Sequence, residues 1–195
     1  MITCPTNVTS NNYVGFTSGI IQVRTDHEAN VATVTWDPPI VTENVSRFNV
    51  TSSPYKSGDE IPISTIHVIT FTATESSGDT DTCNFVISVI DIEDPICTIE
   101  PPSYMGSVEM GQQNSTINYI ITVRDNVQVS SIKTDCSFID IGNSGQEYIV
   151  DRAIEEIDST GTFPIGETMV LFSVVDNASP NGNEGTCSFG VTISG

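Results

Sequence analysis

A cysteine-bearing strand pattern that occurs twice most constrains what this chain can fold into. "DTDTCNFVISVID" at Asp79–Asp91 aligns with "NEGTCSFGVTISG" at Asn183–Gly195, and the two cysteines lie 104 residues apart. Apolar and polar residues alternate in both segments, which is the pattern of a half-buried β-strand. A chain of 195 residues is long enough for two ordinary domains. The recurrence therefore predicts two copies of one unit.

Two further pairs of segments support the duplication. "EIPISTIHVITFTATE" aligns with "TFPIGETMVLFSVVD", and "ITCPTNVTS" at the start parallels "PICTIEPPS" after Pro95. Most apolar runs alternate with period two and are rich in Val and Thr, with Gly, Pro, Asn and Ser between them. We predict an all-β chain with one domain at residues 1–93 and a second at residues 94–195.

The second copy carries added length, which we place around residues 143–161. Asn126 to Pro164 spans 38 residues, whereas Asn44 to Pro62 in the first copy spans 18. Val150, Ile154 and Ile157 have helical spacing, so we expect an exposed loop with a short helix around Val150–Ile157. A longer hairpin is the alternative, because Ile, Val and Tyr also suit strands.

Each copy has one cysteine near its first strand and one in its last. This recurrence predicts the disulfides Cys4–Cys83 and Cys97–Cys187, and with them an oxidising compartment. Metal binding is the weaker interpretation, because no two cysteines have the close spacing of zinc ligands. Cys136 has no counterpart in the first copy and is either a buried thiol or a link to a partner chain.

The charge is strongly acidic throughout, with 25 acidic and 6 basic residues. Residues 1–94 carry 12 acidic and 3 basic side chains, and residues 95–195 carry 13 and 3, so the net charges are −9 and −10. Such a surface argues against nucleic acid or an anionic membrane as partner. It suits a divalent cation, a basic partner or simple solubility.

Targeting and modification signals predict an extracellular location. There is no apolar run of the length of a membrane span and no signal peptide, so we expect a segment of a longer, secreted or cell-surface protein. Asn-x-Ser/Thr acceptor sites for N-glycosylation also occur along the chain. They begin at Asn7, Asn44, Asn49, Asn114 and Asn177.

Together these motifs resemble the hyalin repeat (HYR) family. The first copy contains Cys4-Pro5, "VTWDPP" at Val34–Pro39, "IPIS", "TATE" and "TCNFVISVID". The second contains Cys97, Asp125-Asn126, "FPIG" at Phe163–Gly166, "VVDN" and "TCSFGVTIS", but it lacks the Trp of the "VTW" motif. The resemblance implies tandem immunoglobulin-like β-sandwich domains of extracellular adhesion and matrix proteins. It transfers no catalytic residue.

We therefore expect a non-catalytic adhesion or matrix module that spaces or presents interaction surfaces. Its partner would be an extracellular protein or glycan, and the protein partner could be a second copy of the same chain. The alternative is a carbohydrate- or ligand-binding module that uses the second-domain insertion, and Trp36 with Tyr55 could offer a sugar platform, although a strand Trp is more often part of the core. An enzyme fragment is the third class, but neither His27 nor His67 has a catalytic neighbour in the sequence.

The junction segment "VIDIEDPICTI" at Val89–Ile99 concentrates acidic residues between the copies. Asp91, Glu93 and Asp94 fall within four positions, and Asp125-Asn126 could supply more oxygen atoms. Calcium takes six to eight oxygen ligands, so we expect calcium here, neutralising and stiffening the joint. Acidic linkers between cadherin domains resemble this arrangement. The alternative is that these carboxylates are hydrated and that Pro95 only ends a strand.

Overall fold

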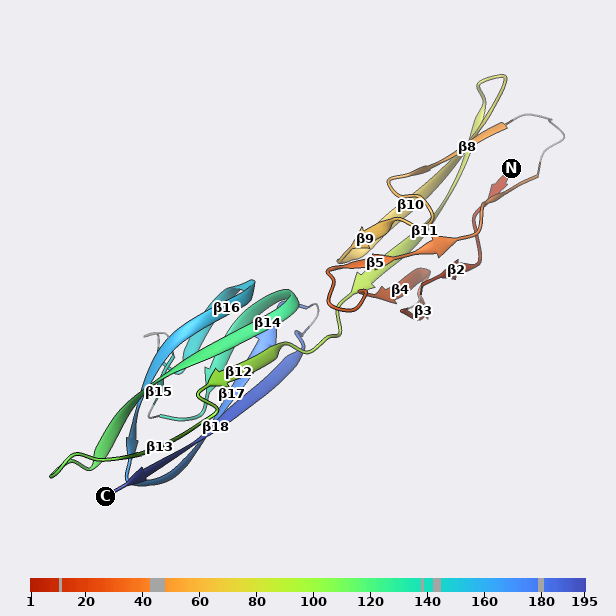
Figure 1. The fold of residues 1–195 in the computed structure, drawn as a ribbon. Coiled ribbons are helices and arrows are strands. Elements are labelled where there is room, and N and C mark those ends of the chain that lie inside the picture. Colours follow the sequence, from red (N-terminus) through yellow and green to blue (C-terminus); the bar gives the residue numbers. More distant parts are fainter. Residues whose placement is uncertain (11, 43–47, 138, 142–144, 179–180) are drawn as a thin grey trace. The chain divides into compact units, whose positions relative to one another are not determined.

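The computed structural model describes residues 1–10, 12–42, 48–137, 139–141, 145–178 and 181–195. Within these residues the regular structure is β-strand, with no helix (Figure 1). Contacts divide the chain into two compact units, Met1–Ile92 and Glu93–Gly195. In the part of the chain that the structure describes, no helix is long and apolar enough to cross a membrane.

The first unit is built on a five-stranded sheet in the order β3-β4-β11-β10-β8. β4 and β11 are parallel, and the other neighbours are antiparallel. The strands are β3 (Tyr13–Thr17), β4 (Ile20–Arg24), β8 (Phe48–Ser53), β10 (Ser64–Glu75) and β11 (Thr80–Ile90).

Three short antiparallel pairs form the rest of this unit: β1–β7, β2–β6 and β5–β9. Their bounds are β1 (Ile2–Thr3), β2 (Val8–Thr9), β5 (Val31–Thr33), β6 (Thr35–Trp36), β7 (Ile40–Val41) and β9 (Glu60–Pro62). Their inward residues, among them Ala32 and Ile61, join those of the large sheet, among them Ile69 and Ile87, in one buried core. Alternation along the strands produces this core, because every second side chain points the same way.

The second unit has the strand order β13-β18-β17-β14-β16-β15, and β12 also pairs with β14. β13 runs parallel to β18, and the other pairs are antiparallel. The strands are β12 (Ile96–Glu100), β13 (Ser103–Ser107), β14 (Asn114–Thr134), β15 (Ile139–Asp140), β16 (Glu147–Pro164), β17 (Gly166–Asp176) and β18 (Glu184–Ser194).

The two units share their central arrangement. β4, β11 and β10 of the first unit correspond to β13, β18 and β17 of the second, with the same directions and with the cysteine-bearing strand in the middle. β8 corresponds to the end of β14, because each is the next neighbour of β10 or β17. Both units are immunoglobulin-like β-sandwiches.

An aromatic trio occupies the same place in each core. Trp36 lies with its ring centre 6.5 Å from that of Phe71 and 5.4 Å from that of Phe85. In the second unit the ring centre of Tyr119 lies 6.2 Å from that of Phe172 and 5.1 Å from that of Phe189. Tyr119 therefore takes the place of the missing Trp.

The added length of the second copy is β-strand, so the predicted loop with a helix around Val150–Ile157 is wrong. Residues 147–164 form β16, which pairs with β14 along almost its whole length. The outcome is the alternative, a longer hairpin. Residues 142–144, including Asn143 at the predicted start of the insertion, lie outside the described residues.

A change of phase within β16 explains the misleading spacing. Tyr148 and Val150 point inward before it, whereas Ile157 and Phe163 point inward after it. The register between β14 and β16 shifts at Val129, between these two stretches. An irregularity of this kind moves the inward side from even to odd positions, so Val150 and Ile157 are both buried although they are seven residues apart.

Candidate functional site

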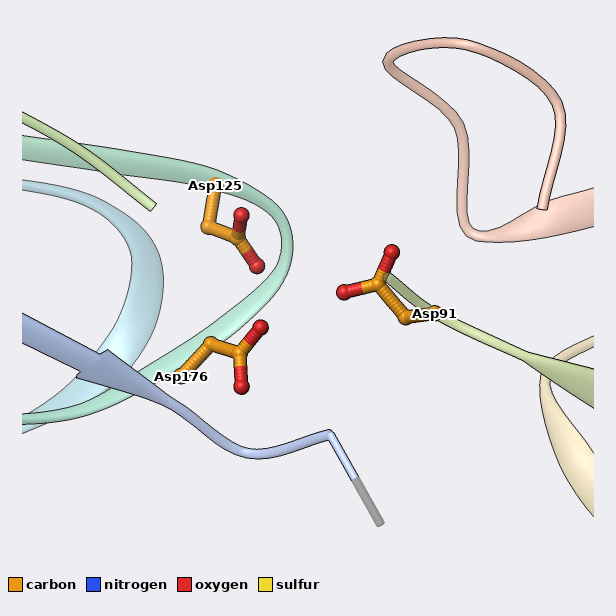
Figure 2. A group of neighbouring side chains, drawn as sticks. All are labelled: Asp91, Asp125 and Asp176. Atoms are coloured by element: carbon orange, nitrogen blue, oxygen red, sulfur yellow. The ribbon is translucent and has the colours of Figure 1, made fainter. Parts of the chain in front are cut away.

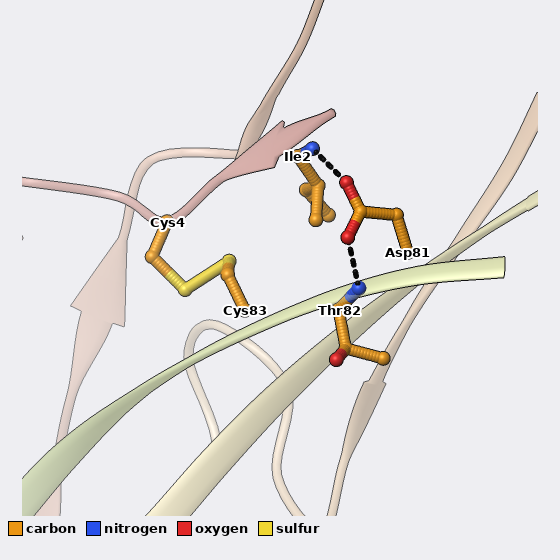
Figure 3. The surroundings of a disulfide bond; sticks show 5 residues. All are labelled: Ile2, Cys4, Asp81, Thr82 and Cys83. Atoms are coloured by element: carbon orange, nitrogen blue, oxygen red, sulfur yellow. Dashed lines mark hydrogen bonds between the residues drawn. A yellow bond between two sulfur atoms is a disulfide. The ribbon is translucent and has the colours of Figure 1, made fainter.

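Each unit is closed by one disulfide, as predicted. Cys4–Cys83 joins the segment after β1 to β11, with the Cα atoms 5.6 Å apart (Figure 3). Cys97–Cys187 joins β12 to β18, with the Cα atoms 5.4 Å apart. Bonds of this kind persist in oxidising surroundings, which indicates an extracellular compartment. Cys136 is a free, half-buried thiol that packs against the second core.

Asp81 connects β1 to β11 next to the first disulfide (Figure 3). Its carboxylate accepts a hydrogen bond from the Ile2 amide at 2.7 Å and another from the Thr82 amide at 3.0 Å. The Ile2 amide is the main reason why the pKa of Asp81 lies below its usual value of 3.8. A donor that bonds the charged form stabilises that form.

Two carboxylates come together within the second unit, those of Asp125 and Asp176. Each offers an oxygen atom within 4.8 Å of the other (Figure 2). Two oxygen atoms at that separation can both lie at 2.3–2.6 Å from one calcium ion. Asp125 comes from β14, and Asp176 is the last residue of β17.

A network of hydrogen bonds orients Asp176. One oxygen, Oδ1, accepts from the Ala178 amide at 2.9 Å and from the Asn183 amide at 2.7 Å, and Oδ2 accepts from the Asn183 side chain at 2.8 Å. Gly182 completes this turn with φ +73, and a Cβ there would lie 2.9 Å from the carbonyl oxygen of Asp176. Because these donors hold both oxygen atoms, the orientation of the Asp176 carboxylate is fixed.

Asp125 lies where β14 changes partners. Before it β14 pairs with β12, and from Val129 onward it pairs with β17. The carboxylate of Asp125 accepts a hydrogen bond from the Val127 amide at 3.2 Å, an Asx-type turn. The following Asn126 is half-buried. Its side chain is the other oxygen source that the sequence predicts in this turn.

The junction carboxylates are divided between the units by sequence position. Asp91 belongs to the first unit, where it accepts a hydrogen bond from the Thr25 hydroxyl at 3.2 Å. Glu93 and Asp94 begin the second unit, and residues 91–95 form no strand.

Asp176 is the residue of this group that the sequence reasoning missed. The "VVDN" motif contains it, but a motif marks a position and does not say what its side chain faces. Only the pairing of β14 with β17 brings the end of β17 next to Asp125. Asn183, its main hydrogen-bond partner, lies seven residues further along the chain.

The predicted glycosylation acceptors are accessible wherever the structure describes them. Asn44 lies outside the described residues, and the other four asparagines are exposed: Asn7, Asn49, Asn114 and Asn177. Trp36 is only 7% exposed and belongs to the first core, whereas Tyr55 packs at the edge of that core. A sugar platform made of these two rings therefore has no exposed Trp face.

Comparison with known proteins gives matches across the chain. "Sushi, von Willebrand factor type A, EGF and pentraxin domain-containing protein 1" of Rattus norvegicus is 30% identical over 184 residues, which are 90% of this chain and 4% of that protein. "Hyalin" of Strongylocentrotus purpuratus is 28% identical over 158 residues, 80% of this chain and 11% of that protein. The chain thus spans only a small part of these relatives.

Two solved structures of tandem modules match nearly the whole chain. The titin domains z1z2 in complex with telethonin match with a TM-score of 0.39 and 11% identity, over 100% of this chain and 99% of that chain. The fibronectin(III)-like modules of Clostridium thermocellum CbhA match with a TM-score of 0.38 and 12% identity, over 96% and 94%. The HYR domain family matches residues 1–89, which is nearly all of the first unit. The first unit of this chain is an HYR domain.

Proposed function

We propose that this chain is a non-catalytic module of an extracellular adhesion or matrix protein, in which two β-sandwich units space and present interaction surfaces. The observation that carries the proposal is the HYR match over residues 1–89, in a chain whose two units are each closed by a disulfide. The correspondence of strands and core aromatics supports a second HYR-like copy. Its partners are extracellular proteins or glycans, including a second copy.

Adhesion can be tested with beads that carry the chain. We expect coated beads to associate with one another or with a surface of extracellular matrix proteins. Beads coated with reduced and alkylated chain are the control, because the units lose their disulfides. If folded chain supports no association, or if it turns over a matrix substrate, the proposed class is wrong.

We further propose that calcium binds the carboxylates of this chain near its junction segment. In the second unit, Asp125 and Asp176 supply a preoriented pair of oxygen ligands, and Glu93 and Asp94 begin the same unit. Asp91 precedes them by two residues and is the predicted ligand from the first unit. Neutralising these groups would reduce repulsion along an acidic linker that has no basic residue between Val89 and Ile99.

Calcium titration by calorimetry, with melting and small-angle scattering, tests the calcium proposal. We expect saturable binding, a higher melting temperature and a narrower distribution of molecular dimensions with calcium. The double substitution Asp91→Asn, Asp94→Asn and the single substitution Asp176→Asn should each weaken binding about tenfold or more, since each removes ligand charge.

The matched control is the double substitution Asp158→Asn, Glu167→Gln. It removes the same charge as the junction double from exposed positions on β16 and β17. If control and junction variants bind calcium equally, the carboxylates act only through net charge. If calcium affinity, melting and dimensions all match the parent in every variant, Val89–Ile99 is only a bend.

A further inference from the structure

The corresponding sheets of the two units differ in what pairs with the outer edge of β8 and of its counterpart, the end of β14. In the second unit Ile132 of β14 pairs with Val174 of β17 on one side and with Tyr148 of β16 on the other. In the first unit Val50 of β8 pairs with Ala73 of β10. Among the described residues, no strand pairs with the other edge of β8. Within the described residues, the first unit therefore has an open edge where the second has β16.

A groove of about 430 Å³ follows this open edge. Its apolar lining comes from β8, from β10, and from β6 with the segment that follows it: Trp36, Pro38, Pro39, Phe48, Val50 and Phe71. In the second unit, inward side chains of β16 occupy the corresponding place, because Val150 is 2% exposed and Tyr148 packs against the core. The first unit thus leaves open a space that β16 fills in the second.

Exposure along β8 agrees with an incomplete edge. Phe48 is 47% exposed, and Val50 is only half-buried although its counterpart Ile132 is 0% exposed. A sheet edge with unpaired backbone groups beside an apolar groove is the usual receptor for an added strand. The main-chain hydrogen bonds give affinity, and the groove selects the inward side chains.

Charge selects among the occupants that would fit. The named lining residues carry no charge, but residues 1–94 have a net charge of −9 and the whole chain −19. A second copy would bring the same negative charge to the groove and be repelled, whereas basic flanks on a strand would be attracted.

We propose that the open edge of β8 binds an extended segment of a partner protein that has alternating apolar residues and basic flanks. The segment pairs antiparallel with β8, as β16 does with β14, and inserts an aromatic side chain opposite Val50, the position that Tyr148 takes opposite Ile132. This inference rests on the proposed role as an interaction module and assigns one of its surfaces.

The probe is a synthetic peptide with the Tyr-Ile-Val sequence of β16 between two pairs of lysines. A second peptide has glutamates in place of the lysines. Trp36 is the only tryptophan of the chain, so its fluorescence reports binding in the groove directly. We expect the lysine peptide to bind at least about tenfold tighter than the glutamate peptide, and the difference to shrink at high salt.

Two variants place the site. Val50→Asp should weaken binding of the lysine peptide about tenfold or more, because it puts a charge under the inserted aromatic ring. Phe16→Asp is the control, since Phe16 is 66% exposed on β3, at the opposite edge of the same sheet. Equal binding by both variants would overturn the proposal.

A second measurement, hydrogen exchange on the unsubstituted chain with and without the lysine peptide, tests the proposal even if Val50→Asp does not fold. The lysine peptide should slow exchange in residues 48–53 and leave residues 13–17 unchanged. Protection elsewhere, or no binding of the peptide, would contradict the proposal. If the peptide fails while coated beads still associate, this inference is wrong and the proposed adhesion function stands.

Discussion

At the residue scale, the two copies differ by a matched pair of substitutions beside the disulfide. In the first unit Asp81, two residues before Cys83, accepts a hydrogen bond from Ile2, two residues before Cys4. In the second unit the equivalent positions hold Gly185 and Pro95. Proline has no N–H to donate, so a carboxylate opposite it would gain nothing. The first unit uses a charge-assisted bond where the second uses close backbone approach.

Gly185 has no space for a side chain. A Cβ there would clash with the carbonyl oxygen of Pro95 and would lie 3.0 Å from its carbonyl carbon. We expect Gly185→Ala to lower the free energy of unfolding of the second unit by roughly 1–3 kcal/mol, because backbone must move. Denaturant melts measure this. Gly190→Ala on the same strand is the control, since a Cβ there meets nothing within 4 Å, and an equal loss in both would refute the explanation.

Asp81 makes the stability of the first unit depend on pH. Its folded pKa is lowered, mainly by the Ile2 amide, so its contribution is present above the usual value of 3.8 and is lost as the pH falls through the folded value. We expect Asp81→Asn to reduce the fall in melting temperature on acidification. Asp79→Asn is the control. This substitution removes the same charge, but the carboxylate of Asp79 accepts its hydrogen bond from the Ser77 hydroxyl, whereas that of Asp81 accepts one from the Ile2 amide. Identical pH profiles in both variants would contradict this role.

At the element scale, β16 is the main departure from the internal repeat. β16 pairs with the edge of β14 that corresponds to the open edge of β8. At the other side of the sheet, β3 of the first unit pairs with β4, whereas β13, the counterpart of β4, is the last strand in the order of the second unit. Each unit has therefore added a strand at an opposite edge of the same central sheet. Added length that pairs along its course is stabilised by backbone hydrogen bonds, which explains why it is strand and not the expected helix.

Adjacent residues of β16 test this assignment. Val150 is 2% exposed and Ile149 is 70% exposed. We expect Val150→Ala to destabilise the second unit by roughly 2 kcal/mol, since it removes buried methyl groups, and Ile149→Ala to cost well under about 1 kcal/mol. Thermal melting of the two variants measures the difference. Similar costs at both positions would mean that β16 does not alternate as described.

At the scale of the whole molecule, each unit has its own core and its own disulfide. The first core and the second core are separate clusters of buried side chains. The bridges close segments of 79 and 90 residues, which in the chain-entropy model stabilise each unit by about 4–5 kcal/mol. Small extracellular domains depend on such links because their cores are limited in size.

Removing one disulfide should therefore affect one unit. We expect the double substitution Cys97→Ser, Cys187→Ser to lower the melting temperature of the second unit and to leave the melting temperature of the first unit unchanged. Calorimetry measures both. Cys136→Ser, which removes a thiol without a bridge, is the control. A downward shift of both transitions by the same amount would show that the units do not unfold independently.

The sequence by itself determined the all-β class, the presence of two units and both disulfides. These depend on local alternation and on cysteines that recur in equivalent strands, and neither needs knowledge of distant contacts. Only the tertiary structure decided that residues 147–164 are a strand, that Asp176 lies beside Asp125, and that β8 has an open edge. Each of these is a relation between segments far apart in the chain. Sheet pairing sets such relations, and the period of a single segment does not encode its neighbours.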